Sequence, residues 1–239
     1  NIAKQNGFEI VEADVNASSF VWEIDPSNPK RLYQPLAGLK GLGEAAIQQI
    51  VDNRPFNNIE EFLFNDNIVY SKLNKKALDV LTRSGAMNSL MDERFTGRKH
   101  FWSAVASDRV YSKKKFLENV KDYAEEGDFT VAEEIDNKTT LTGIFPMSLV
   151  MTDAVKTKLE NHFVPAISDY DPELGLVWFI PREIIKKRTK NDKPYWIVAV
   201  IDSNSVLTKF RCWGIVEGKD RIHLNRPYMG KLDFDQTWG

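Results

Sequence analysis

Cysteine and histidine are scarce in this sequence of 239 residues. Cys212 is the only cysteine, which excludes an intrachain disulfide and a zinc site made of several thiolates. The three histidines, His100, His162 and His223, stand far apart along the chain, so no histidine cluster is predicted. We expect each histidine to be structural, Cys212 to be a buried small apolar residue, and the chain to hold no metal or other cofactor.

Long hydrophobic runs are lacking as well. No apolar run approaches the roughly 18 residues that a membrane-spanning helix needs, and the sequence shows no signal peptide. These features predict a chain without a membrane partner. The sequence begins with Asn1 rather than methionine, so we expect a processed chain or a piece of a longer one.

An excess of basic charge is also absent. Lys and Arg number 32 against 34 Asp and Glu, a formal net charge of −2 that excludes a uniformly basic surface. The charges are nevertheless uneven. Residues 118–136 contain eight acidic residues and one basic residue, Lys121, and predict a solvated acidic connector. Residues 182–193 contain six basic and two acidic residues and predict a basic hairpin of formal charge +4, so local binding of nucleic acid stays open.

Helical signals dominate residues 31–95, in a chain whose length favours two modest domains. Three helices are predicted there, over 44–51, from Asn58 onward and over 73–83, and one or two more within 96–125. Asn58 is the expected N-cap of the second helix, with Glu61 three residues later. Gly85 is the expected C-cap glycine of the third.

Strand signals frame this helical region. Residues 7–11 and 19–24 alternate between apolar and polar side chains, and Pro26 and Pro29 are expected to end this first section. From about residue 174 the composition changes to β-branched and aromatic residues. Strands are predicted over 174–180, 196–201 and 207–213. The overall expectation is an α+β chain, with a helical domain followed by a small, OB-like β-barrel of five strands.

A glycine hairpin precedes the first predicted helix, in Gly38-Leu39-Lys40-Gly41-Leu42-Gly43. Gly41 and Gly43 can take positive φ, so that successive backbone N–H groups converge on one anion at the start of the helix. This is the pattern of a helix-hairpin-helix motif, with Lys40 beside a DNA phosphate. An ordinary glycine turn is the alternative. A dinucleotide site is poorly supported because Pro35 breaks the preceding strand, and no Walker A sequence closes the run.

A second basic unit follows in the helix predicted over 73–83. Its bases, Lys72, Lys75, Lys76 and Arg83, would flank the same duplex. A solvated helix face is the alternative interpretation of this unit.

The third predicted β-strand alternates basic and apolar residues. Lys209, Arg211 and Trp213 are expected on one face, and Phe210 and Cys212 in the core. Together with the basic hairpin, this face would bind single-stranded nucleic acid by stacking bases on aromatic side chains. The predicted single-strand contacts are Lys186, Lys187, Arg188, Lys190, Lys193, Lys209, Arg211 and Trp213. In the alternative interpretation, Trp213 belongs to the core and the bases are solvated.

Four motifs in order resemble the C-terminal part of bacterial and phage replicative DNA polymerase III alpha subunits. They are GFEIVEADVNASSFVWE (7–23), LAGLKGLGEAA (36–46), NRPFNNIEEF (53–62), and LNKKAL with SGAMNSL (73–90). Ala13 stands where that family usually has proline. KKRTKNDKPYW (186–196) resembles the entry to the family's OB-fold strands, with Asn191-Asp192 in place of a turn glycine.

The resemblance implies an order of segments. Residues 1–30 would form the end of a fingers-like segment, 31–115 the helix-hairpin-helix domain, 116–173 the acidic connector and 174–239 the OB-like domain. It implies duplex phosphate contacts by Gly38, Lys40, Gly41, Gly43, Lys75 and Lys76. The family's catalytic aspartates, and the magnesium they bind, belong to an upstream palm that nothing here matches. No catalytic and no metal-binding residue is therefore expected in this chain.

The expected function is the DNA-holding portion of a replicative DNA polymerase, a nucleotidyltransferase of DNA replication, in the cytoplasm of a bacterial or phage-infected cell. Its expected partners are duplex DNA, single-stranded template, and a catalytic polymerase segment or chain. A sliding clamp is a further candidate partner, although residues 126–129 match the family's clamp peptide poorly. The alternative is a replisome module that docks a clamp or a partner subunit. A freestanding nuclease or ligase is disfavoured because no metal-binding carboxylate set stands out.

Overall fold

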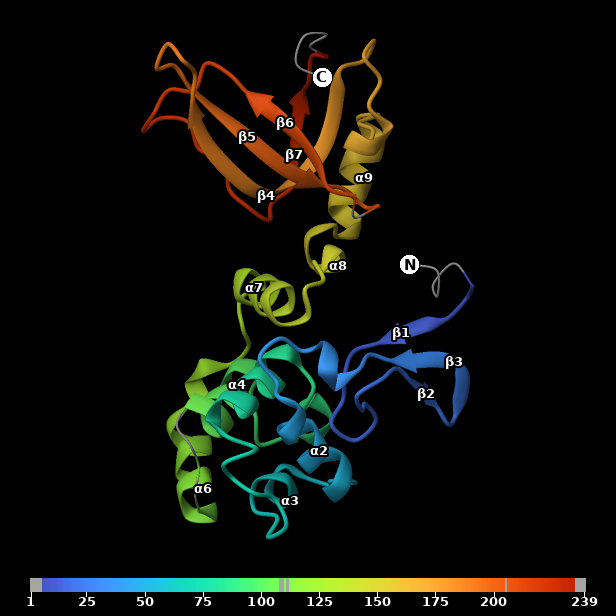
Figure 1. The fold of residues 1–239 in the computed structure, drawn as a ribbon, viewed down its shortest axis with the longest axis vertical. Coiled ribbons are helices and arrows are strands. Elements are labelled where there is room, and N and C mark those ends of the chain that lie inside the picture. Colours follow the sequence, from blue (N-terminus) through green and yellow to red (C-terminus); the bar gives the residue numbers. More distant parts are fainter. Residues whose placement is uncertain (1–5, 108–109, 111, 205, 235–239) are drawn as a thin grey trace. The chain divides into compact units, whose positions relative to one another are not determined.

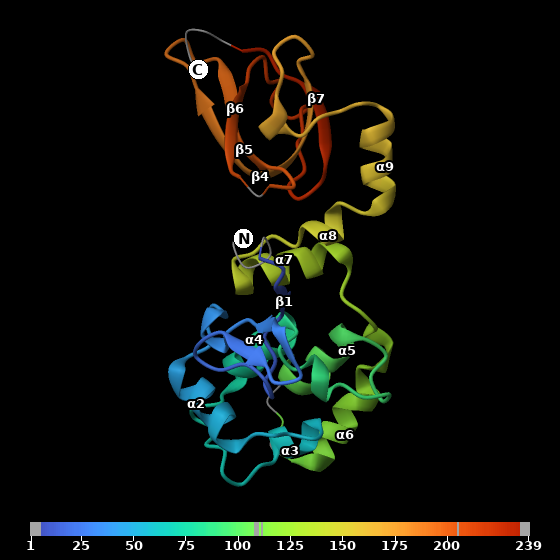
Figure 2. The same ribbon diagram turned by 90° about the vertical axis from the view of Figure 1, so that its right-hand side faces the viewer.

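A computed structural model describes residues 6–107, 110, 112–204 and 206–234 of the chain (Figures 1 and 2). The chain forms two compact units, Asn1–Ile144 and Phe145–Gly239. The first unit is mainly helical and the second is built on a curled antiparallel sheet, which confirms the α+β prediction with an OB-like second domain. Among the described helices, none has the length and apolar character needed to cross a bilayer.

A three-stranded sheet opens the first unit. Its central strand, β3 (Asn28–Tyr33), pairs in parallel with β1 (Glu9–Val11) and antiparallel with β2 (Glu23–Asp25). The predictions that Pro29 ends the strand section and that helical structure begins at residue 31 are therefore wrong. The register jumps from Asp25↔Asn28 to Ile24↔Leu32. Pro29 lies in that irregularity, where its missing N–H costs no ladder hydrogen bond.

The predicted helices are present, with the expected caps. The helices of the first unit are η1 (Leu36–Gly38), α2 (Glu44–Asn53), α3 (Ile59–Leu63), α4 (Lys75–Ser84), η2 (Asn88–Leu90), α5 (Arg98–Trp102), η3 (Ser103–Ser107, a π-helical turn), α6 (Lys113–Asp122), η4 (Ala124–Glu126) and α7 (Val131–Thr142). Asn58 Oδ1 accepts a hydrogen bond from the Glu61 amide, and Gly85 ends α4 with φ +90°. Local capping chemistry therefore sets these boundaries.

One hydrophobic core runs through the first unit. Leu39 and Leu42 anchor the glycine hairpin to it, next to Ile47 and Ile50 of α2. Phe116 of α6 and Leu141 of α7 belong to the same core. The segment assigned by sequence to a connector, 116–173, is thus divided between the two units at residue 144.

The acidic stretch of 118–136 carries a helix and several ion pairs. α7 begins with a capping box, in which Thr130 Oγ1 accepts from the Glu133 amide and Glu133 Oε2 accepts from the Thr130 amide. Lys99 Nζ lies 2.9 Å from Glu133 Oε1 and 3.7 Å from Glu126 Oε2. Part of the acidic charge is therefore neutralised inside the first unit instead of being fully solvated. The Thr-x-x-Glu spacing was the local signal for this helix start.

We expect acid to weaken the first unit through Glu133. Hydrogen bonds from the Thr130 amide, from Lys99 and from the Thr130 hydroxyl lower the pKa of Glu133 from 4.5 to about 2. A carboxylate with a lowered folded-state pKa stabilises the fold above pH 4.5, and this contribution is lost as the pH falls toward 2. Thermal unfolding over this range is expected to show a falling melting temperature. Glu133→Gln, which keeps a capping side chain, should flatten that dependence, and an unchanged dependence contradicts this role.

The second unit contains a four-stranded antiparallel sheet in the order β6-β5-β4-β7. The strands are β4 (Leu176–Arg188), β5 (Pro194–Ile201), β6 (Thr208–Cys212) and β7 (Tyr228–Lys231), preceded by α8 (Met147–Val150), α9 (Asp153–Asn161) and η5 (Ile167–Asp169). The predicted strands at 196–201 and 207–213 correspond to β5 and β6. Within the described residues the sheet has four strands, where five were expected.

β4 is much longer than the sequence suggested. The segment predicted as a basic hairpin, 182–193, is mostly strand, since β4 runs on to Arg188 and only the turn after it separates β4 from β5. A bulge lies between Pro181 and Glu183, and the Arg182 side chain covers the Phe145 ring at 4.2 Å from its centroid. The basic run is therefore the exposed end of a strand whose first half is apolar and buried.

Candidate nucleic-acid interface

The glycine hairpin (residues 38–43) has the turn that its sequence predicts, with one difference. Gly41 has φ +93°, a conformation that side chains with Cβ rarely adopt. Gly43, in contrast, is extended, with φ −81° and ψ 153°, and forms the N-cap of α2. The expectation of positive φ is thus correct for Gly41 and wrong for Gly43. Gly43 has an ordinary extended N-cap conformation, which residues other than glycine also adopt.

The glycine hairpin and the first residues of α2 carry four backbone amides with no acceptor among the described residues. The amides of Ala46 and Ile47 donate to the Gly43 carbonyl and begin the helical hydrogen bonds. Within the described part of the chain, the amides of Gly41, Gly43, Glu44 and Ala45 donate to no acceptor. Free amides at the positive end of a helix form a binding site for an anion such as phosphate.

The structure brings Lys76 next to this turn. A Cβ placed on Gly41 would lie 3.4 Å from Lys76 Cε and 3.5 Å from Val80 Cγ2. The first two turns of α4 therefore pack against the hairpin. Lys40, Lys75 and Lys76 are all exposed, and neither Lys40 nor Lys76 enters an ion pair with a described residue. The ammonium groups of Lys40 and Lys76 are therefore exposed beside the hairpin.

Arg83 does not share this position. Its guanidinium binds Asp79, with Nη2 2.6 Å from Oδ2, and donates to Asn137 Oδ1 at 3.2 Å. These partners hold the Arg83 side chain against α4 and α7, and its place beside a duplex stays a prediction.

A basic aromatic face (Lys187, Tyr195, Lys209, Arg211 and Trp213) lies on the sheet of the second unit. Strand register pairs Lys187 with Tyr195, Ile197 with Arg211, and Ala199 with Lys209. Trp213 is 51% exposed and stacks on Tyr195, with ring centroids 4.6 Å apart. Phe210 and Cys212 alternate with these residues and pack against the core. The expected alternation is therefore present, and Trp213 is not a core residue. Tyr195 was not among the predicted site residues. Pairing of its strand with the one that carries Lys187 was the signal that could have placed it on this face.

The remaining predicted single-strand residues are not gathered on that face. Lys186 pairs with Trp196 and holds its ammonium 5.7 Å from the indole centroid, beside a hollow of about 290 Å³. Arg188 is bound by two acids, Asp192 at 3.3 Å and Glu217 at 2.7 Å, whose charges raise the pKa of its guanidinium. Lys190 and Lys193 are exposed at the turn. Alternation along β4 places Lys186 and Arg188 opposite Lys187.

Carboxylates, cysteine and histidines do not form a metal centre in the described residues, where no three of them gather. His100 is fully buried, with Nδ1 3.0 Å from the Thr96 amide and Nε2 2.7 Å from the Val120 carbonyl. These contacts give His100 a structural part between α5 and α6.

The poorly matching clamp peptide, residues 126–129, is built into the first unit. The Gly127 carbonyl accepts from the His100 amide at 2.9 Å, and Asp128 Oδ1 accepts from the Arg98 amide at 2.8 Å. Phe129 lies 6.1 Å from the Trp102 ring. A partner that took up this segment as an extended peptide would have to break these contacts.

Known proteins similar to this chain include a helix-hairpin-helix family and DNA polymerase III alpha subunits. Residues 7–97 match the family model of the helix-hairpin-helix motif. The DNA polymerase III subunit alpha of Pseudomonas aeruginosa is 35% identical over 105 residues, which cover 42% of this chain and 9% of that protein. The subunit alpha of Aquifex aeolicus is 25% identical over an alignment of 245 residues, which covers 98% of this chain and 20% of that protein.

The chain therefore spans a fifth or less of the length of these two relatives. The match over residues 7–97 confirms the helix-hairpin-helix prediction. The resemblance to DNA polymerase III alpha subunits is likewise confirmed, along nearly the whole chain.

Proposed function

We propose that this chain is a DNA-holding portion of a replicative DNA polymerase and takes part in DNA replication. The helix-hairpin-helix unit holds duplex phosphate, and the OB-like unit holds the single-stranded template. The catalytic palm, with its magnesium ions, lies in another segment or another chain. The proposed place of action is the cytoplasm of a bacterial or phage-infected cell.

The arrangement at the start of α2 carries this proposal. Four free amides, at Gly41, Gly43, Glu44 and Ala45, lie next to the exposed side chains of Lys40 and Lys76. Such a site binds a phosphate oxygen without reading a base, as a protein that travels along any sequence requires. The similarity to DNA polymerase III subunit alpha supports duplex DNA as the source of that phosphate.

A parallel titration tests the proposal. The full chain is mixed with a short duplex and with a single-stranded oligonucleotide of the same length, and both are expected to bind at low salt. Affinity should fall steeply as salt is added, because phosphate contacts release counterions. Failure to bind either nucleic acid, or nucleotide incorporation by this chain alone, contradicts the proposal.

Trp213→Ala is expected to weaken single-strand binding about tenfold, because one stacked base contributes roughly 1–3 kcal/mol. Duplex affinity should stay unchanged. Trp22→Ala serves as the matched control, since Trp22 is 50% exposed in the first unit and Trp213 is 51% exposed. Fluorescence anisotropy with a labelled oligonucleotide measures the change. An equal loss in both variants, or no loss in Trp213→Ala, contradicts the assignment.

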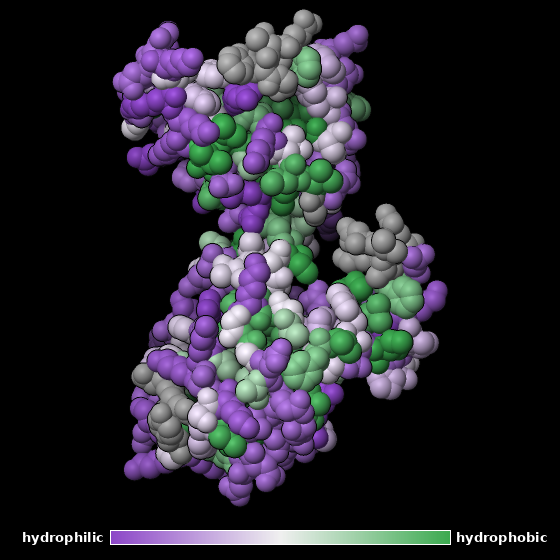
Figure 3. All heavy atoms as spheres, viewed as in Figure 1, coloured by the Kyte–Doolittle hydropathy of each residue, from purple (hydrophilic) through white to green (hydrophobic). Residues whose placement is uncertain are grey.

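A protein-docking module is the second candidate, and one surface favours it. Phe20, Val21, Trp22 and Ile24 are 38%, 62%, 50% and 58% exposed. Apolar residues gather over the small sheet of the first unit (Figure 3). Exposed apolar patches mark protein-interaction sites. Capture of a sliding clamp by the chain, with no binding of DNA in the parallel titration, would favour this function over the first.

A further inference from the structure

The C-terminal end of α7 meets the glycine hairpin, although the two are far apart in sequence. The Leu141 carbonyl accepts a hydrogen bond from the Lys40 amide at 2.7 Å. Gly143, the C-cap of α7 with φ +72°, lies under the Lys40 side chain. A Cβ on Gly143 would lie 3.3 Å from Lys40 Nζ and 3.4 Å from Cε. The helix end thus touches both the backbone and the ammonium group of Lys40.

This contact has an electrostatic reason. The last carbonyl groups of a helix carry partial negative charge and favour a cation beside them. The Lys40 ammonium lies at that end of α7, while its amide is already occupied by Leu141. The Lys40 backbone is therefore fixed by α7, and its ammonium is favoured beside the end of that helix.

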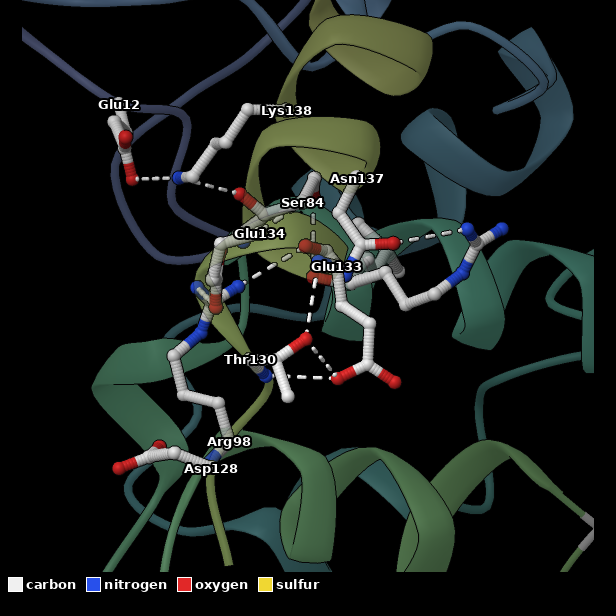
Figure 4. A network of polar contacts seen from close by, with 12 residues as sticks. Glu12, Ser84, Arg98, Asp128, Thr130, Glu133, Glu134, Asn137 and Lys138 are labelled. Atoms are coloured by element: carbon white, nitrogen blue, oxygen red, sulfur yellow. Dashed lines mark hydrogen bonds and ion pairs between the residues drawn. The ribbon is translucent and has the colours of Figure 1, made fainter. Parts of the chain in front are cut away.

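α7 is held in this place chiefly by polar contacts (Figure 4). Lys138 Nζ lies 2.5 Å from Glu12 Oε2 and donates to the Ser84 carbonyl at 3.0 Å. Glu134 forms an ion pair with Arg98, whose Nη2 donates to the Arg83 carbonyl at 3.0 Å. Both cations thereby reach the C-terminal carbonyls of α4. The docking of α7 depends on charges, since Ile135 and Leu141 are its only buried apolar residues among those described.

The Arg98–Glu134 pair is the most sensitive of these contacts. The two side chains are only 17% and 16% exposed. Removal of one partner leaves the other charge uncompensated in a place that water scarcely reaches. A neutral side chain at position 134 is therefore expected to loosen α7 from the first unit.

We propose that α7 positions the helix-hairpin-helix for DNA, with Glu134, Lys138, Leu141 and Gly143 as positioning residues that act through Lys40. This inference rests on the proposed function, because it assumes that the hairpin binds duplex phosphate. It adds a second element to the motif, contributed by a helix that follows the matched residues 7–97.

Glu134→Gln tests this proposal, because the expected change in duplex affinity is opposite in sign to the change expected from the loss of a negative charge alone. Removal of a negative charge alone should raise affinity for DNA, whereas loosening of α7 is expected to lower duplex affinity about tenfold. Asp136→Asn is the matched control, since it removes the same charge from the exposed face of the same helix. Its duplex affinity should be unchanged or slightly higher. Equal affinities in Glu134→Gln and Asp136→Asn overturn the proposal.

Hydrogen exchange gives a readout that needs no DNA. The Lys40 amide is expected to exchange about tenfold faster in Glu134→Gln than in the unaltered chain and in Asp136→Asn. Amides in the middle of α2 should keep their rates, which separates loosening of α7 from general destabilisation. Unchanged protection of Lys40 overturns the proposal.

A second variant covers the case in which Glu134→Gln fails to fold. Gly143→Ala places a Cβ against Lys40 at a backbone φ of +72°, and is expected to raise the Lys40 exchange rate and lower duplex affinity. If Gly143→Ala changes neither, the proposal is wrong. If DNA binding proves independent of the hairpin while Lys40 exchange still responds, the proposed function fails and the bracing of Lys40 by α7 stands.

Discussion

Gly97→Ala is expected to destabilise the first unit by about 3 kcal/mol and to lower its melting temperature by roughly 10 °C. A Cβ on Gly97 would lie 2.4 Å from the Gly127 carbonyl carbon, 2.5 Å from the Asp128 nitrogen and 2.5 Å from the Gly127 oxygen. All three atoms belong to the backbone, so no flexible side chain can move aside. The chain around 127–128 has to shift to admit one methyl group.

That shift breaks two hydrogen bonds that join this segment to α5. The Gly127 carbonyl would lose the His100 amide, and Asp128 would lose the Arg98 amide. Unpaired polar groups and a displaced Phe129 add to the steric cost. Gly38→Ala is the matched control, because its Cβ would meet only Pro35 Cγ, at an ordinary 3.7 Å. Calorimetry should show a large drop for Gly97→Ala and almost none for Gly38→Ala, and similar values for the two contradict the account.

Lys40→Glu together with Gly41→Val is expected to lower duplex affinity about a hundredfold at low salt, or roughly 2.7 kcal/mol. Glutamate repels the phosphate that lysine attracts. Valine cannot take the φ of +93° at Gly41, and its Cβ would meet Lys76 Cε at 3.4 Å. The charge and the orientation of the free amides are lost together.

Lys121→Glu is the control for this double variant, since Lys121 is exposed on α6 of the same unit. It makes the same change of charge away from the hairpin, and is expected to cost only a small, salt-sensitive part of the affinity. Circular dichroism checks that the double variant keeps its helices. A folded double variant with unchanged duplex affinity contradicts the role given to the hairpin.

Local signals in the sequence were enough to predict the framework of the first unit. Asn58 begins a helix and Gly85 ends one through contacts with residues three positions away, so their roles can be read from spacing. The turn at Gly41 can likewise be predicted from the local spacing of glycines. The resemblance to DNA polymerase III alpha subunits then gave the order of the domains.

Contacts between distant segments could not be predicted in this way. Nothing in the spacing places Lys76 beside Gly41, or Leu141 on the Lys40 amide, because packing of α4 and α7 brings them together. The length of β4 was missed because a run of bases suggests a solvated turn, whereas here the ladder with β5 continues through the basic residues to Arg188↔Pro194, and their side chains are exposed. Pro29 led to the wrong strand end because a register irregularity, which the sequence does not reveal, lets this proline lie within the central strand β3.

An amide spectrum recorded during a duplex titration tests most directly whether the free amides of the hairpin bind phosphate. In a ¹⁵N-labelled chain, the signals of Gly41, Gly43, Glu44 and Ala45 are expected to move together as a short duplex is added. Addition of inorganic phosphate should shift the same signals in a weaker form. If the duplex binds and these four signals stay in place while others move, the hairpin is not the phosphate site.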